Sequence, residues 1–325
     1  MDPRIEWDRL PSEWKTIFKK NLVFQNELVT EQSSQSKFAA RYYDMDTYWR
    51  VFFSDRSVEE SVTDDELRQI LSLKKVKCGG TKIDSLAPVA ALRLDSLEYL
   101  DCNHTNIEEL NDLGATFTLR TLEIEHTGVT DLGPIRSSPG LAQLYFSNTG
   151  VVDITPLADL PHLVNVDFND TDVLDLAPLG SATTLQTVVM NGCRQVRDTA
   201  PLGAAESLVK LDISRTAVSS LNDLAAHRHL QILVAGELDI DNIEVVADLS
   251  ELESLYINNA TRPIDLACLR SAPSLRALYV GGTEVRNAQA ILDLPSLEIL
   301  FHSSLPSSLC RELRAERPTC AITSH

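Results

Sequence analysis

A leucine recurs every 22 or 23 residues through most of this 325-residue chain, and the repeat constrains the fold more than any other feature. Its copies follow an earlier one at Leu73: Leu97, Leu119, Leu141, Leu163, Leu185, Leu208, Leu230, Leu252, Leu275 and Leu297. We number positions from this leucine, so the residue that follows it is +1. Self-similarity at a period of roughly 20 to 50 residues is typical of stacked repeat proteins. The sequence therefore predicts about eleven repeats, which we place in residues 71–302.

Each repeat carries the pattern of a short strand followed by a turn and a helical return. Apolar residues stand at +3 and +5, as in Leu122 and Ile124, and this alternation predicts a strand with both side chains facing inward. A threonine usually follows at +8, where the chain must turn, and then comes a segment such as Asp153-Ile154-Thr155-Pro156-Leu157. The aspartate can cap a short helical turn and the proline can occupy its first position. One repeat has too little apolar surface to fold alone, so neighbouring repeats must stack into a curved solenoid.

These residues resemble the leucine-rich repeat, in the 22-residue type of bacterial internalins and eukaryotic phosphatase regulators. The resemblance covers residues 71–320 and implies an α/β repeat fold, with parallel strands on the concave face of the solenoid. It implies a binding scaffold and says little about the partner, because the family has many unrelated partners. Internalins are secreted or attached to the cell wall. This chain shows neither a basic segment followed by an apolar one near Met1 nor an anchoring tail, so we expect a bacterial protein of the cytoplasm.

The two ends of the chain differ from the repeats and predict caps. Residues 1–70 are expected to form a mainly helical N-terminal cap, opened toward the first repeat by a capping box at Thr63 and Glu66. Residues 303–325 are expected to form a C-terminal cap, with a helix from Ser307 to Arg317 and a final strand over 318–322. The N-terminal segment is rich in aromatic residues: Trp7, Trp14, Phe18, Phe24, Phe38, Tyr42, Tyr43, Tyr48, Trp49, Phe52 and Phe53. Both caps would shield the open ends of the solenoid.

The charge balance narrows the class of partner. The chain holds 29 lysine and arginine residues against 47 aspartate and glutamate residues, a formal charge of −18. Nucleic acid and anionic membranes are therefore disfavoured as partners, and no apolar run is long enough to span a bilayer. The six cysteines have no close spacing: Cys78, Cys102, Cys193, Cys268, Cys310 and Cys320. Several stand at core positions, so we expect six reduced thiols, with Cys78 and Cys102 near one another.

No sequence motif for catalysis or for a cofactor is present, so the sequence predicts a protein that is not an enzyme and needs no cofactor or metal. Glycines follow several predicted strands, at Gly79–Gly80, Gly192 and Gly281–Gly282. We interpret them as residues of turns with positive φ, which glycine adopts readily, and not as phosphate-binding loops. His104 and His126 share position +7 in adjacent repeats and are expected to lie near each other. A metal would need a further ligand there, and Cys102 should face the core, so we interpret the histidines as a solvated pair.

The strand face is the candidate docking surface, because side chains at +2, +4 and +6 should point away from the core. Its N-terminal half is acidic and its C-terminal half is apolar and aromatic. The residues predicted to bind a partner are Tyr99, Asp101, Glu123, Glu125, Tyr145, Asp167, Asp212, Tyr256, Tyr279 and Phe301. Exposed apolar and tyrosine side chains in one file favour an interface. The alternative is that the aromatic residues reflect strand propensity alone and the acidic ones only solubility.

These observations favour a non-enzymatic protein binder. The first hypothesis is an inhibitor or immunity-type protein that neutralises a basic toxin or enzyme through its concave face, with charge complementarity speeding association. A second is an intracellular regulator or adaptor that docks on a signalling enzyme. A third is an effector delivered into a host cell. The sequence leaves these three open, together with the identity of the partner and the oligomeric state.

Overall fold

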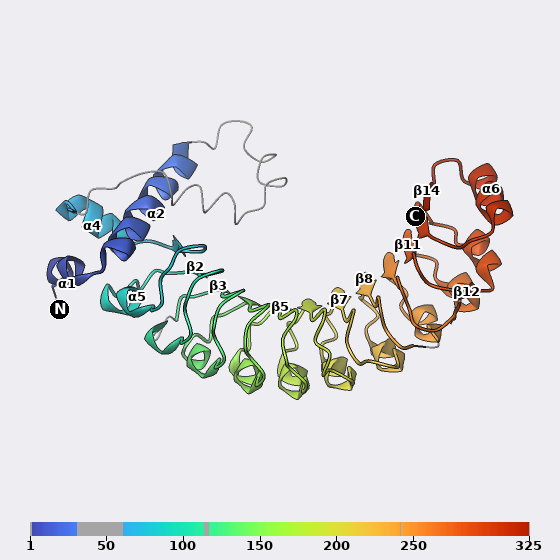
Figure 1. The fold of residues 1–325 in the computed structure, drawn as a ribbon, viewed down its shortest axis with the longest axis horizontal. Helices are drawn as coiled ribbons and strands as arrows, with labels where there is room; N and C mark the ends of the chain where they lie inside the picture. Colours follow the sequence, from blue (N-terminus) through green and yellow to red (C-terminus); the bar gives the residue numbers. More distant parts are fainter. Residues whose placement is uncertain (1, 31–60, 114–116, 241, 325) are drawn as a thin grey trace. The chain divides into compact units, whose positions relative to one another are not determined.

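The structure is a computed structural model that describes residues 2–30, 61–113, 117–240 and 242–324, and the side chains of all of these except 24–30. The chain divides into two compact units, residues 1–151 (unit 1) and 152–325 (unit 2). In both units a repeat consists of a short strand, a turn and a short helical return, as the sequence predicts (Figure 1). The strands lie on one side of each unit and the helical returns lie on the other.

Unit 1 begins with helices and continues into four parallel strands. The helices are α1 (Pro3–Arg9), α2 (Ser12–Thr30), α4 (Asp64–Leu71) and α5 (Ala87–Ala91), and the 3₁₀ helices are η2 (Asn111–Leu113) and η3 (Gly133–Ser137). The strands pair in chain order as β1 (Lys75–Lys77), β2 (Tyr99–Asp101), β3 (Thr121–Glu123) and β4 (Gln143–Tyr145). Each strand pairs with the same repeat position in its neighbour, so side chains of one position form a column across the sheet.

Unit 2 continues the pattern with eight parallel strands. They are β5 (Asn165–Asp167), β6 (Thr187–Val189), β7 (Lys210–Asp212), β8 (Ile232–Val234), β9 (Ser254–Tyr256), β11 (Ala277–Val280), β13 (Ile299–His302) and β14 (Ala321–Ser324). The returns are η4 (Thr155–Asp159), η5 (Ala177–Ser181), η6 (Ala200–Ala204), η7 (Asn222–Ala226), η8 (Glu244–Ala247), η9 (Ala267–Ser271) and η10 (Ala288–Asp293), followed by helix α6 (Ser307–Glu316). A second sheet of two short strands, β10 (Ile264–Asp265) and β12 (Val285–Arg286), was not expected from the sequence.

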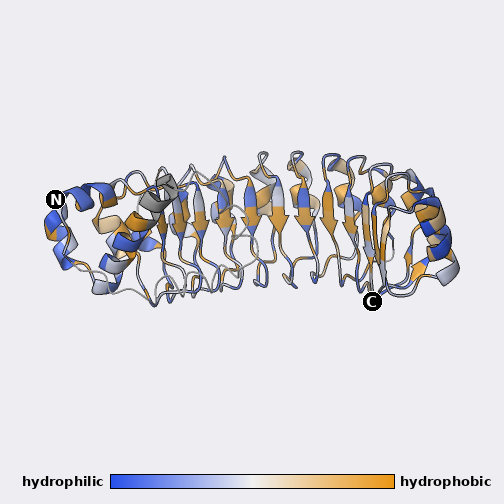
Figure 2. Cartoon of the chain, turned by 90° about the horizontal axis from the view of Figure 1, so that it is seen from above, coloured by the Kyte–Doolittle hydropathy of each residue, from blue (hydrophilic) through white to orange (hydrophobic). Residues whose placement is uncertain are grey.

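The two predicted core columns are confirmed. Position +3 is at most 1% exposed in Leu100, Leu122, Leu144, Val166, Val188, Leu211, Leu233, Leu255, Leu278 and Leu300. Position +5 is fully buried in Cys102, Ile124, Phe146, Phe168 and Met190. The apolar residues recur side by side in successive strands (Figure 2). Burial of one such aliphatic or aromatic side chain contributes about 1.5–3 kcal/mol, so the columns supply most of the force that stacks the repeats.

The turn after the strand has one conformation in every described repeat except the last, where Ser304 at +7 does not adopt a positive φ. Residue +7 adopts a positive φ in ten successive repeats: Gly80, His104, His126, Asn148, Asp170, Gly192, Arg215, Glu237, Asn259 and Gly282. The threonine at +8 then donates its hydroxyl hydrogen to the carbonyl oxygen of +5, as Thr127 does to Ile124 at 2.7 Å. Glycine is therefore an option at this turn and not a requirement, because asparagine, histidine and even arginine accept the same backbone there.

The helical returns start as the sequence indicates, with one shift of position. Asp153 Oδ1 accepts a hydrogen bond from the backbone N–H of Thr155, the first residue of η4, at 2.8 Å. Pro156 is the second residue of η4, where its missing N–H has no partner to lose. Asp175 and Asp198 make the same bond to the first residues of η5 and η6. The aspartate thus stands two residues before the helix and not directly at its cap.

The N-terminal cap closes the edge of the sheet with a side-chain amide. Asn21 of α2 accepts from the N–H of Lys77 and donates to the carbonyl oxygen of Lys77, both at 2.9 Å, which copies the pairing of a further strand. Trp7, Trp14 and Phe18 pack together beneath it, with ring centroids 5.1 Å apart for Trp14 and Phe18 and 6.5 Å for Trp7 and Phe18. The other eight aromatic residues singled out in this segment lie outside the described side chains.

The capping box and the C-terminal elements occur where the sequence predicts them. The Thr63 hydroxyl accepts from the N–H of Glu66, and the Glu66 carboxylate accepts from the N–H of Thr63 at 2.8 Å. Helix α6 ends at Glu316, and β14 starts at Ala321 instead of 318, because Cys320 N–H bonds the carbonyl of Arg317 in a turn that contains Pro318. All six cysteines have free thiols, and the expected proximity is confirmed by a separation of 3.3 Å between the Sγ atoms of Cys78 and Cys102.

Candidate docking surfaces on the strands

The strand face of unit 1 is a hydrogen-bonded polar network. The Tyr99 hydroxyl donates to Glu123 Oε1 at 2.8 Å, and the Asn103 amide nitrogen donates to Glu123 Oε2 at 3.1 Å. Asn103 also accepts from the N–H of Glu125 at 2.7 Å, which ties one repeat to the next. Tyr99, Glu123 and Glu125 are half-buried, as is Tyr145 on β4. The carboxylate of Glu123 is therefore already occupied by groups of the same chain.

Asp101 requires a correction, because the sequence places it on an exposed acidic surface and the structure buries it. Its exposed fraction is 5%. Its Oδ1 accepts from the N–H of Asn103 at 3.1 Å, and a β-carbon added to Gly79 would come within 2.8 Å of the same oxygen. Gly79 is thus the residue that leaves room for the carboxylate. Asp101 is buried because the turn that contains Gly79 packs against its carboxylate. The spacing of the repeats alone does not predict where that turn lies.

The aspartates of the unit 2 strand face have the same local role. Asp167 Oδ1 accepts from the N–H of Asn169 at 3.3 Å, and Asp212 Oδ1 accepts from the N–H of Ser214 at 2.9 Å. Both side chains are half-buried. An aspartate at +4 therefore satisfies the backbone at the end of its own strand. This local bond is a sufficient structural reason for aspartate at the position, and it weakens the argument that these two residues indicate a partner.

Two lysines also lie on the unit 1 strand face, which makes it less acidic than the sequence suggests. The Nζ atoms of Lys75 and Lys77 lie 5.9 and 5.3 Å from the ring centroid of Tyr99, within cation–π range. Burial lowers the pKa of Lys77, while the charges of Asp101 and Glu123 oppose that shift. Burial and the same two carboxylates raise the pKa of Tyr99 well above its usual range, so its hydroxyl stays protonated and donates to Glu123.

An aromatic file crosses three neighbouring strands of unit 2. The rings of Tyr256 and Tyr279 stack with centroids 4.1 Å apart and planes 8° apart, and Phe301 follows at 6.1 Å from Tyr279. A β-carbon on Gly281 would come within 2.3 Å of Phe301 Cε1, so the Phe301 ring lies directly against the Gly281 backbone. Burial and the hydrogen bond with Tyr279 raise the pKa of Tyr256. All three rings are half-buried, so each keeps part of its surface exposed.

The surface around this file carries no charged side chain at +2, +4 or +6. These positions on β8, β9, β11 and β13 are Ile232, Val234, Gly236, Ser254, Tyr256, Asn258, Ala277, Tyr279, Gly281, Ile299, Phe301 and Ser303. We call this set the aromatic patch. Ile299 is among the most exposed large apolar residues that the structure describes, at 40%. Nine of these residues keep exposed surface, whereas Gly236, Ala277 and Gly281 are buried. A neutral patch of nine partly exposed residues is a marked exception in a chain with a charge of −18.

The two histidines lie near each other, as the sequence predicts. The rings of His104 and His126 stack 4.2 Å apart with planes at 12°. No group of three or more histidine, cysteine or acidic side chains within metal-binding reach occurs among the described residues. The glycines at 80, 192 and 282 adopt positive φ in their turns.

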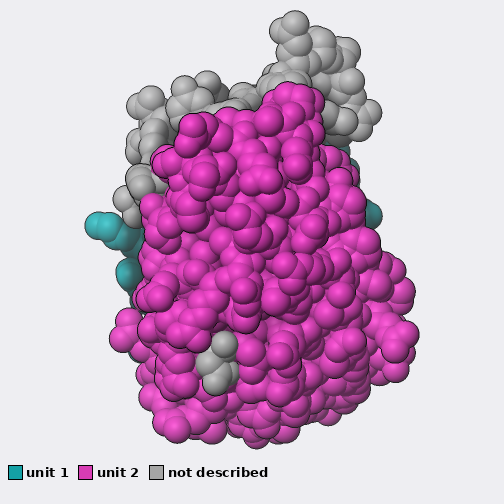
Figure 3. Space-filling model, turned by 90° about the vertical axis from the view of Figure 1, so that its right-hand side faces the viewer, with its two compact units in different colours: residues 1–151 teal, residues 152–325 magenta. Residues whose placement is uncertain are grey.

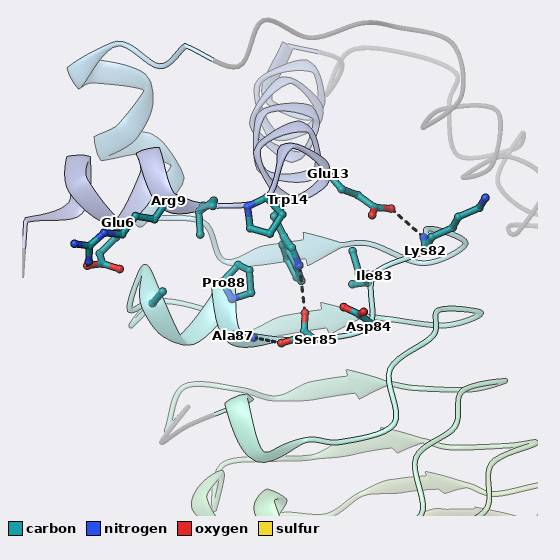
Figure 4. A pocket seen from close by; sticks show the side chains of 13 residues that line it. Glu6, Arg9, Glu13, Trp14, Lys82, Ile83, Asp84, Ser85, Ala87 and Pro88 are labelled. Carbon is teal, nitrogen blue, oxygen red and sulfur yellow. Dashed lines mark hydrogen bonds and ion pairs between the residues drawn. The ribbon is translucent and has the colours of Figure 1, made fainter.

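A cavity of about 370 Å³ lies between the N-terminal helices and the first repeat in unit 1 (Figure 4). Trp14 and Pro88 form its apolar wall, and the Trp14 indole N–H donates to the carbonyl oxygen of Ser85 at 3.2 Å. This cavity could not be predicted from the sequence, because its walls come from segments about 70 residues apart, as the bond between Trp14 and Ser85 shows. Glu6 and Arg9 pair at 3.3 Å on its rim, and Glu13 accepts from the N–H of Lys82 at 3.0 Å. The hydroxyl of Ser85 in its lining donates to Asp112 Oδ2 at 3.1 Å and accepts from the N–H of Ala87, the first residue of α5, at 3.0 Å.

Comparison with known proteins places the fold. No protein-family model and no curated protein matches the chain. Among solved structures it is similar to an internalin (InlF) of Listeria monocytogenes, at a TM-score of 0.60 and 23% identity over 86% of this chain and 94% of that one. It is also similar to a leucine-rich repeat protein of Leptospira interrogans, at a TM-score of 0.62 and 16% identity over 79% of this chain and 74% of the other.

A third similar structure is the leucine-rich repeat ectodomain of a plant receptor kinase, GASSHO1/SCHENGEN3 of Arabidopsis thaliana, in complex with CASPARIAN STRIP INTEGRITY FACTOR 2. The TM-score is 0.54, with 16% identity over 80% of this chain and 36% of the receptor chain. The chain therefore folds as leucine-rich repeats, with helical elements at both ends. No helix in the described segments is long and apolar enough to cross a membrane.

Proposed function

We propose that this leucine-rich repeat protein is a non-enzymatic binder of a protein partner, and that the aromatic patch of unit 2 is its main docking surface. Within this class we favour an inhibitor or immunity-type protein that occludes a basic toxin or enzyme in the cytoplasm. The fold is typically a protein-binding scaffold, and the similar plant ectodomain is seen in complex with a partner.

The observation that carries the proposal is the neutral file of Tyr256, Tyr279 and Phe301 in a strongly acidic chain. Their packing against each other and against Gly281 holds the rings in place before any partner arrives. Binding would therefore cost little side-chain entropy, and tyrosine in such a setting is a frequent hot spot. Strand propensity explains an aromatic residue at one position, but it gives no reason for nine neutral, partly exposed residues together.

The preference for a basic partner rests on the charge of the whole chain. Asp101 is buried, and Glu123 is bonded to Tyr99 and Asn103, so neither carboxylate is available for an ion pair without a loss elsewhere. The formal charge of −18 nevertheless produces a negative field around the molecule, and such a field speeds encounter with a basic protein. The net charge thus speeds association with the partner, and the aromatic patch provides most of the binding free energy.

Photo-crosslinking in the native host tests the location of the surface. A photo-reactive benzoylphenylalanine replaces Tyr279 in one variant and Leu174 in the other; both sites lie in unit 2 and expose apolar surface. Leu174 is 59% exposed in the irregular segment between β5 and η5, outside the strand, which makes it the matched control. We expect one protein of basic charge to crosslink from position 279 and not from position 174. Crosslinking of the same protein from 174 alone would move the docking surface off the strands.

A further inference from the structure

The two ends of the strand ladder are closed differently. At the N-terminal edge, Asn21 bonds both backbone groups of Lys77 that point away from the sheet. At the other edge, β14 pairs with β13 alone, in the register Leu300 to Ile322. Helix α6 buries Leu309 and Leu313 behind the last repeat. Among the described residues, no side chain or strand bonds the outer edge of β14.

The outer edge of β14 presents specific backbone groups. The N–H of Ala321 donates to the carbonyl oxygen of Glu298, so Ala321 faces β13. Backbone groups alternate in direction along a parallel strand, so Ile322 and Ser324 direct their N–H and C=O groups outward. Ile322 is also half-exposed, although its partner in register, Leu300, is only 1% exposed. Within the described segments, the outer edge therefore has neither hydrogen-bond partners nor apolar cover.

The edge also lacks the features that normally prevent pairing. The strand Ala321-Ile322-Thr323-Ser324 contains no proline, charge or bulge, which are the usual protections of an exposed strand. Residues 303–324 hold three arginines and two glutamates, a formal charge of +1 in a chain of −18. Two copies of this acidic protein would repel each other at most surfaces, and this end is one where they approach without that penalty. Figure 3 looks onto this end of unit 2.

We propose that β14 is an interface for a second copy of this chain. The two β14 strands pair antiparallel around a two-fold axis, so that Ile322 and Ser324 of each copy exchange backbone hydrogen bonds with the other. The pairing is self-complementary, as a two-fold interface requires, and it covers the exposed flank of Ile322 in both copies. The pairing uses the outer edge of β14 and no residue of the aromatic patch, so it does not rest on the proposed function.

Sedimentation velocity on the full chain at rising concentration tests this proposal. The parent protein is expected to shift from monomer to dimer. Ile322→Pro removes an outward N–H, and Ser324→Pro does so at an exposed position with less effect on packing. Each is expected to weaken the dimer by about tenfold or more, since one backbone hydrogen bond is lost twice by symmetry. Thr323→Pro, which removes an inward N–H bonded to β13, should instead lower the melting temperature.

Two controls separate this interface from others. Tyr256→Ala with Tyr279→Ala alters the aromatic patch and should leave the dimer unchanged. Circular dichroism and thermal melting show whether the Ile322→Pro and Ser324→Pro variants keep the parent fold. A parent that stays monomeric at the highest concentration overturns the proposal. So does a dimer that survives both edge variants with the fold intact, because the contact would then lie elsewhere.

Discussion

The strand face of unit 1 and the aromatic patch of unit 2 are built on the same backbone and carry opposite chemistry. On unit 1, the polar groups bond each other: Tyr99 and Asn103 both donate to Glu123. On unit 2, Tyr256 and Tyr279 stack within a surface that has no charge. Groups that satisfy one another gain little from a partner, whereas half-exposed rings gain from further burial. A shared architecture thus supplies a stabilising face in one unit and the proposed docking face in the other.

The largest expected loss of stability comes from the core that both units share, and not from either strand face. Phe168→Ala removes a fully buried ring at +5 and should lower the free energy of unfolding by about 3–5 kcal/mol. Tyr256→Ala removes a half-buried ring one column away and should cost far less. Chemical denaturation of the two variants gives the comparison. If Tyr256→Ala proved as costly as Phe168→Ala, the aromatic patch would be part of the core and its docking role would lose its basis.

A smaller loss of stability is expected from the unit 1 network. Glu123→Ala leaves the Tyr99 hydroxyl and the Asn103 amide without their acceptor and should cost about 1–2 kcal/mol. Glu284→Ala is the matched control, because Glu284 is an exposed glutamate of unit 2. A double-mutant cycle with Tyr99→Phe isolates the bond between the two residues. Zero coupling in that cycle would show that the network does not stabilise unit 1.

Acid should destabilise unit 2 through a buried histidine. His227 is fully buried, with Nδ1 3.3 Å from the carbonyl oxygen of Ala205 and no described partner for Nε2, and burial lowers its pKa below the ordinary 6.5. The unfolded chain therefore binds more protons below pH 6.5, so stability is complete above that pH and falls as the pH drops toward the lowered pKa.

His227→Leu places an aliphatic side chain where the next repeat has Leu249, at the same end of its 3₁₀ helix. It should raise the free energy of unfolding by about 1 kcal/mol at neutral pH, because an unsatisfied buried nitrogen is removed. It should also flatten the fall in stability below pH 6.5. Denaturant titrations of both proteins across that range measure the difference. Parallel curves would show that another group causes the acid sensitivity.

The smallest effect concerns charge and the rate of association. Glu125→Lys should slow binding of the partner and change the affinity by less than about 1 kcal/mol, since exposed charges contribute little to bound-state energy. Glu284→Lys makes the same charge change on unit 2 and should slow binding equally if the field of the whole chain steers the partner. If Glu125→Lys slowed association more than Glu284→Lys, the acidic residues of the unit 1 face would steer the partner directly. Asp101 is unsuitable for this test, because a lysine there would be buried.

The fold could be predicted from the sequence because the buried apolar residues that determine it recur at a regular interval. The columns through Leu122 and Ile124 repeat at 22 or 23 residues, and any stacking that buries them gives the observed sheet. The caps were also recoverable where a local motif exists, as for the pairing of Thr63 with Glu66. The closure of β1 by Asn21 was not, because it depends on how a helix 56 residues away packs against the strand.

The candidate site was less predictable, because it depends on contacts between repeats. Sequence position places Asp101 and Tyr279 in the same outward column, yet one is buried and the other keeps an exposed ring. The difference comes from neighbours: Gly79 leaves room for the Asp101 carboxylate, and Gly281 seats the Phe301 ring beside Tyr279. A pattern of glycines one repeat away from a large side chain is the signal that could have indicated both arrangements.

The most direct test of the account is the dissociation rate of the captured partner from matched pairs of variants. Tyr256→Ala with Tyr279→Ala should weaken binding by about 1–4 kcal/mol, chiefly through faster dissociation, while stability stays near that of the parent. Val152→Ala with Leu174→Ala removes apolar surface that is 48% and 59% exposed in the irregular segments before η4 and η5 of the same unit, and should leave the rate unchanged. An unchanged rate in the tyrosine pair, with faster dissociation in the turn pair, would contradict the assignment of the aromatic patch as the docking surface.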